Sequence, residues 1–122
     1  MTGLLMKTIP GLKLKLILQD NATLLGRGKI ELLKAIAKEH SLSQAAKSLG
    51  MSYRRAWLLI RELNDSMKTP VLITQTGGQS GGGSELTETA TRLIELYEKL
   101  AADAELATKA TREQVAYLLK SN

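Results

Sequence analysis

The chain has 122 residues, of which 43% are apolar and 24% are charged, a composition typical of one small globular domain. It contains no cysteine and a single histidine, His40, which excludes disulfides and cysteine-ligated zinc and argues against a histidine-based catalytic set. The net charge of +5 is uneven: residues 1–84 hold 12 Lys/Arg and 5 Asp/Glu, whereas residues 85–122 hold 5 and 7. This split indicates a polyanion-binding N-terminal part and an assembly tail, although lysines that merely solvate helix faces would give the same count.

The same composition predicts a cytoplasmic protein that is not an enzyme. No uncharged apolar stretch approaches the roughly 20 residues of a membrane span, and Lys13 and Lys15 interrupt the apolar run near the N-terminus that a signal peptide would need. We therefore expect no membrane partner. We also predict no catalytic residue, no metal site and no cofactor.

The N-terminal region predicts one strand and one helix. Residues 12–18 alternate apolar and basic side chains, the period of a half-buried strand. Residues 19–28 are predicted to form a loop, and residues 28–40 a helix with His40 in its last turn.

Residues 41–67 predict a helix-turn-helix. Ser41 followed by Gln44 is a capping-box pattern that starts a short helix, and Gly50 suits the left-handed turn that ends it. Ser52 can cap the next helix at once, and that helix must end before Pro70. The side chains expected to lock the two helices together point inward and are Leu49, Met51, Ala56 and Leu59.

Residues 71–87 predict a β-hairpin, or wing. Residues 71–76 are rich in β-branched side chains, residues 77–83 hold five of the ten glycines, and residues 85–87 can form the returning strand. The glycine run lacks the Gly-Lys-Ser/Thr ending of a P-loop, so nucleotide binding is excluded. As a wing tip, Gly78, Gln79 and Ser80 would approach the DNA backbone or minor groove.

Residues 88–120 predict a dimerisation helix. Apolar side chains spaced three and four residues apart form a seam of the kind that pairs with another helix, and the candidate dimerisation residues are Leu93, Tyr97, Leu100 and Ala104. The seam would equally pack within one chain against residues 12–18. Thr111 with Gln114 could cap a separate last helix, so one helix and two helices both stay open.

The predicted fold is therefore mainly α with a small β component. It is a winged helix-turn-helix over residues 12–87 with a long C-terminal dimerisation helix over residues 88–120. In this fold the helix at residues 52–67 enters the DNA major groove. The candidate DNA-binding residues of the two helices are Ser43, Gln44, Ser52, Tyr53, Arg54, Arg55, Leu58 and Arg61.

Each candidate has a chemical reason. Arginines 54 and 55 can bond guanine N7 and O6 or a phosphate, and Leu58 can contact a thymine methyl group. Ser43 and Gln44, at a helix start, can donate to phosphates together with free backbone amides. Trp57 lies on the flank of the helix and is expected to pack.

The chain resembles the ModE family of molybdate-responsive transcription regulators over residues 12–108, and more broadly the LysR-type winged helix. The residues that carry the resemblance are Ser43–Lys47, Gly50–Trp57 with Ile60, Leu63 and Asn64, and Thr76–Gly83 with Leu86 and Thr87. It implies an N-terminal DNA-binding domain that dimerises through its long helix. Members of the family also carry C-terminal oxyanion-binding domains, for which this sequence offers no strands. The resemblance therefore assigns molybdate sensing to no residue of this sequence. Gln79 stands where a basic wing-tip residue is common among relatives.

Together these observations predict a homodimeric transcriptional regulator that binds a palindromic operator in double-stranded DNA, with an unknown effector. The alternatives are a winged helix that binds an acidic protein, a molybdenum-related oxyanion-binding protein, and an architectural DNA protein without sequence preference.

Overall fold

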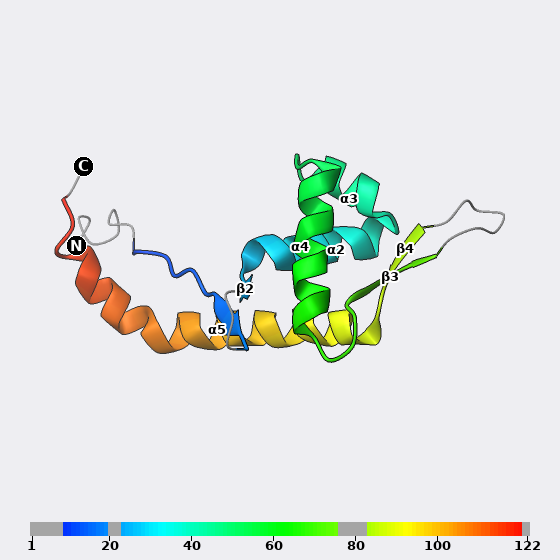
Figure 1. Cartoon of the computed structure of the whole chain (residues 1–122). Coiled ribbons are helices and arrows are strands. Elements are labelled where there is room, and N and C mark those ends of the chain that lie inside the picture. Colours follow the sequence, from blue (N-terminus) through cyan, green and yellow to red (C-terminus); the bar gives the residue numbers. More distant parts are fainter. Residues whose placement is uncertain (1–8, 20–22, 76–82, 121–122) are drawn as a thin grey trace.

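The computed structural model describes residues 9–19, 23–75 and 83–120. Figure 1 shows a group of shorter helices seated over the N-terminal half of a long helix, with a hairpin at the side. The elements in chain order are β1 (Leu16–Leu18), β2 (Thr23–Leu25), α2 (Arg27–Glu39), α3 (Leu42–Ser48), α4 (Tyr53–Ser66), β3 (Leu72–Gln75), β4 (Gly83–Leu86) and α5 (Glu88–Ala116). The mainly α winged helix-turn-helix with a long C-terminal helix is thereby confirmed.

Helix α2 is the centre of the core. Its side chains Ile30, Leu32, Leu33 and Ile36 are buried, and it packs against α3, α4, β4 and α5. Burial of this aliphatic face supplies the main hydrophobic stabilisation, at roughly 1.5–3 kcal/mol for each fully buried side chain. Because α2 contacts every other helix of the described chain, it fixes their relative positions.

The N-terminal strand is shorter than predicted. Only Leu16–Leu18 forms β1, which pairs antiparallel with β2 in the register Leu16↔Leu25. The prediction of a strand from Leu12 is wrong, and so is the prediction of a loop at residues 23–25. Residues 12–15 have no partner strand, and the extended segment that contains them is held to α5 by side chains instead: Tyr97 Oη donates to the Leu14 carbonyl at 2.8 Å.

Helix α5 is one continuous helix from Glu88 to Ala116, and Thr87 caps its start through a bond from the Ala90 amide. No break occurs at Thr111, because the backbone stays helical through Gln114. The C-terminal part of α5 curves away from its first half (Figure 1).

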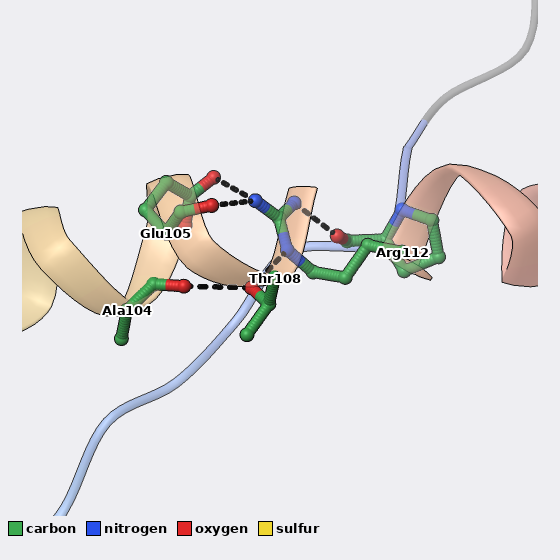
Figure 2. Close-up of polar contacts among 5 residues, drawn as sticks. Ala104, Glu105, Thr108 and Arg112 are labelled. Carbon is green, nitrogen blue, oxygen red and sulfur yellow. Dashed lines mark hydrogen bonds and ion pairs between the residues drawn. The ribbon is translucent and has the colours of Figure 1, made fainter. Parts of the chain in front are cut away.

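A polar cluster around Arg112 fastens the N-terminal segment to this outer part of α5 (Figure 2). The Arg112 side chain is only 11% exposed and pairs with the Glu105 carboxylate at 2.9 Å. It also donates to the Glu105 carbonyl, to Thr108 Oγ1 and, 102 residues away in the sequence, to the Pro10 carbonyl at 2.8 Å. Thr108 in turn donates to the Ala104 carbonyl at 2.7 Å. A nearly buried guanidinium is stable here because acceptors surround it.

Candidate nucleic-acid interface

Two serine caps and one glycine set the geometry of the helix-turn-helix. Ser41 Oγ accepts from the Gln44 amide, and Ser52 Oγ accepts from the Arg55 amide, both at 3.1 Å. Between them Gly50 has φ +69°, the left-handed conformation that favours glycine. The Met51 amide then bonds back to the Ala46 carbonyl at 3.0 Å. The predicted caps and turn are confirmed, and they fix the angle at which α4 leaves α3.

The inward-facing set differs in part from the prediction. Ala45, Ala46 and Ala56 are fully or almost fully buried, which lets α3 and α4 approach closely. Leu49, however, is 39% exposed, so its predicted inward role is wrong. It is the C-cap residue with φ −97° and ψ 2°, one position after α3 ends, and so no longer lies on the inner face of that helix. Met51 and Leu59 are half-buried at the edge of the core.

The outward face of α4 carries all the predicted candidates of this helix. The exposed residues at its cap and on this face are Ser52, Tyr53, Arg54, Arg55, Leu58 and Arg61. Ser43 and Gln44 are exposed at the start of α3. The start of α4 is the end of this helix that lies farthest from α5 (Figure 1).

This face is uniformly cationic over the first part of α4. Arg54 and Arg55 form no ion pair with any described residue, and residues 53–61 contain no acid. The acids of α4, Glu62 and Asp65, lie toward its C-terminal end. Because the N-terminus of a helix also carries partial positive charge, the geometry suits a polyanion.

Arg61 and Trp57 form a separate pair beside this face. The Arg61 guanidinium lies 5.4 Å from the centre of the Trp57 ring, and its Nε is 3.9 Å from the Asp65 carboxylate. Trp57 is 43% exposed, so the expected packing role is met by Arg61 and not by the core. Arg61 is thus partly neutralised, unlike Arg54 and Arg55.

Two residues, Asn64 and His40, position the hairpin in a way that the sequence did not predict. Asn64, near the end of α4, bonds to the backbone of the segment leading into β3. His40 adopts φ 57° at the C-cap of α2, where its carbonyl accepts from the Ser84 amide at 3.3 Å. An asparagine before a proline-containing connection and a histidine after a helix are weak signals, because both commonly occur on surfaces. Strands β3 and β4 pair from Leu72↔Leu86 to Gln75↔Gly83, and the predicted wing-tip residues Gly78, Gln79 and Ser80 lie outside the described residues.

The predicted dimerisation residues have unequal accessibility. Leu100 is exposed, and Leu93 and Ala104 are half-buried. Tyr97 is only 5% exposed, and its hydroxyl donates to the Leu14 carbonyl of its own chain, which is the packing against residues 12–18 that the seam also allowed. Leu96, which the spacing argument passed over, is exposed and borders a groove of about 570 Å³ together with Leu93 and Met67. The role of all four residues in dimerisation stays a prediction.

Two other kinds of site, a membrane span and a metal site, concern the described part of the chain. None of its helices combines the length and apolarity needed to traverse a lipid bilayer. Nor do residues 9–19, 23–75 and 83–120 bring three or more potential His, Asp or Glu metal ligands together.

Known proteins resemble part of this chain. The family described as bacterial regulatory helix-turn-helix protein, lysR family, matches residues 28–91, just over half of the chain. The DNA-binding transcriptional dual regulator ModE of Escherichia coli K12 is 47% identical over 73 residues, 60% of this chain and 28% of that relative. The molybdenum transport protein ModE of Azotobacter vinelandii is 33% identical over 96 residues, 79% of this chain and 36% of the relative. The molybdenum-pterin-binding protein MopB of Rhodobacter capsulatus is 34% identical over 86 residues, 70% of this chain and 32% of the relative. The chain thus spans roughly a third of the length of these curated relatives.

Proposed function

The chain belongs to the lysR family of bacterial regulatory helix-turn-helix proteins, and we propose that it is a transcriptional regulator that binds specific sequences in double-stranded DNA. The observation that carries the proposal is the acid-free first part of α4, which presents two unpaired arginines on a rigidly capped helix. The proposal is limited to DNA binding, because the relatives whose names refer to molybdenum are about three times as long as the matched region.

In this proposal α4 lies in the major groove with its N-terminal half leading. Arg54 and Arg55 bond base edges or phosphates, and Tyr53 and Ser52 add hydroxyls at the helix start. Ser43 and Gln44 hold the register by donating to phosphates at the start of α3. Leu58, with 44% of its surface exposed, meets a thymine methyl group.

The hairpin is proposed to contact the DNA beside α4. Strand β4 is held to α2 by the His40 carbonyl, and the residue before β3 is held to α4 by Asn64. Both strands are therefore fixed relative to α4, the proposed recognition helix. Gly78, Gln79 and Ser80 would offer backbone amides to the phosphate backbone or minor groove. Gln79 and Ser80 carry no charge, so this contact contributes little to the salt dependence.

A homodimer is proposed because α5 leaves apolar side chains uncovered beside its packed face. Leu96 and Leu100 are 42% and 43% exposed and continue the half-buried Leu93, which is the arrangement a second α5 would bury. Ala104 extends the same seam. Two α4 helices related by a two-fold axis would then read a palindrome with half-sites about 34 Å apart.

Selection of binding sequences from random duplex oligonucleotides tests the function directly. We expect a two-fold symmetric sequence to be enriched and its binding to weaken steeply as salt is raised. Enrichment of no sequence would favour an architectural DNA protein. Binding to duplex DNA no tighter than to heparin would favour a winged helix that takes an acidic protein. Either result would overturn the proposal.

A further inference from the structure

A cavity of about 770 Å³ lies away from the proposed DNA face, between residues 12–15, the first turn of α2 and the α5 segment from Tyr97 to Glu105. Its volume falls in the range of small-molecule sites, about 300–1,000 Å³. No residue of α3 or α4 lines it. Figure 1 shows that β1 and α5 lie at the opposite end of the helix group from the start of α4.

Part of the cavity wall is apolar. Leu12 and Leu14 contribute from the extended N-terminal segment, Ile30 from α2, and Tyr97 and Ala101 from α5. The Tyr97 hydroxyl is already used by the Leu14 carbonyl, so it offers the cavity its ring and not a free donor. A ligand for these walls needs an apolar body.

The charged groups at the rim are unequally compensated. Glu31, Glu98 and Glu105 each have a cationic partner, in Arg27 at 3.7 Å, Lys34 at 2.9 Å and Arg112 at 2.9 Å. Lys13 and Lys15 also line the cavity, and neither forms an ion pair or hydrogen bond with a described residue. Two cations are therefore left over at a site whose acids are all neutralised.

The start of α2 adds positive potential at the same place. Its N-cap is Gly26, which supplies no side-chain cap, and its first turn contains no acid. Lys15 lies directly against this start, since a Cβ on Gly26 would stand 3.2 Å from Lys15 Cγ. A cation beside an uncapped helix N-terminus is unfavourable unless an anion is present. At Gly28, which lines the cavity, a Cβ would meet nothing within 4 Å, so the space over this turn is open.

We propose that this cavity binds an amphipathic organic anion, with its apolar body between Leu14, Ile30 and Tyr97 and its acidic head between Lys13, Lys15 and the start of α2. One wall of the site is the start of α2, the helix that contacts every other described helix. The proposal does not depend on DNA binding, since the two sites share no residue.

The test is a titration of the whole chain with decanoate, followed by amide chemical shifts. We expect saturable shifts confined to residues 12–15, 26–31 and 97–105, with decylammonium and inorganic phosphate at the same concentrations leaving these amides unmoved. Shifts of equal size with decylammonium would show that the lysines do not select an anion. Equal shifts with phosphate would remove the role of the apolar walls. No saturable shift with decanoate would overturn the site altogether.

Matched variants assign the binding to the cavity. Lys13→Gln with Lys15→Gln is expected to weaken decanoate binding about tenfold, equivalent to ~1.4 kcal/mol, whereas Lys109→Gln with Lys120→Gln, at exposed positions in α5 and just after its end, leaves it unchanged. Ala102→Trp, at the rim, should block binding, while Ala110→Trp on the same helix should not. Equal effects of the paired variants would contradict the proposal. A DNA-binding measurement on the lysine variants separates the two functions, because operator affinity should stay within about twofold of the parent if the sites are independent.

Discussion

The carboxamide oxygen of Asn64 accepts a hydrogen bond from the backbone amide of Val71 at 2.7 Å, and its nitrogen reaches the Leu72 carbonyl at 3.5 Å. Val71 is fully buried, so its amide has no access to water. One side chain therefore serves as the partner that the backbone needs where it leaves the proposed recognition helix and enters the hairpin.

Replacing Asn64 by alanine is expected to destabilise the protein by about 1–3 kcal/mol, because the buried Val71 amide loses its acceptor. Asn64→Asp should cost less, since it keeps the acceptor and loses only the long bond to Leu72. Urea unfolding monitored by circular dichroism measures both. Ser66→Ala, two residues on, serves as the control, and equal losses for Asn64→Ala and Ser66→Ala would contradict this role.

Arg54→Ala is expected to weaken binding to the selected operator by about 1–3 kcal/mol and to relax preference at one base position. Arg54 is exposed and free of ion pairs, so its removal should not alter folding stability. Fluorescence anisotropy with the operator and with single-base variants gives both numbers. Lys109→Ala, which removes the same charge from the outer part of α5, should leave affinity nearly unchanged. A loss that is equal for all DNA sequences would instead identify Arg54 as a phosphate contact.

Gly50→Ala tests the turn between α3 and α4. Nothing lies within 4 Å of a Cβ at this position, so the substitution meets no clash and its cost is that of the left-handed backbone alone. That cost is about 1–2 kcal/mol, and Gly50→Asn should show a smaller one because asparagine tolerates this conformation better. Thermal unfolding of the parent and of the two variants measures the order of their stabilities. An alanine variant as stable as the parent would mean that the turn can relax to another geometry.

Tyr97→Phe removes the hydroxyl that holds the Leu14 carbonyl and keeps the ring that fills the core. We expect a loss of about 0.5–1.5 kcal/mol in the free energy of unfolding. Tyr53→Phe is the matched control, because that hydroxyl is exposed and has no described partner. An unchanged stability for Tyr97→Phe would show that the N-terminal segment is held by its other contacts.

The helix-turn-helix could be predicted from the sequence because local chemistry determines it. Ser41, Gly50 and Ser52 act on residues within a few positions of themselves, through caps and a left-handed turn, so their effect is visible in the sequence. The exposed arginines of α4 followed from the helical period once those boundaries were known. The error at Leu49 also concerns local structure. Leu49 is the C-cap, one residue after α3 ends, so an error of one residue in the predicted end of the helix places it on the inner face.

The features that escaped prediction depend on contacts distant in sequence. The spacing of Tyr97 fits a helix seam and leaves open whether it packs on a second chain or on residues 12–18, and only the structure shows that its hydroxyl donates to a carbonyl 83 residues earlier in the same chain. Strand β2 has only three residues, too few to show a strand pattern in the sequence. It forms because it pairs with the hydrogen-bonding edge of β1. The hydrogen bond from the Ser84 amide to the His40 carbonyl could not be predicted, because it depends on where the hairpin packs against α2.

The Arg112 cluster makes the two extremities of the described chain depend on each other. The outer part of α5 extends past the helix group (Figure 1), and Arg112 there donates to the Pro10 carbonyl of the N-terminal segment. Breaking the guanidinium contacts would release both segments in one event, well below the free energy of global unfolding. Amide hydrogen exchange should accordingly report residues 9–14 and 106–116 as a single cooperative opening unit, distinct from the slowly exchanging amides of α2.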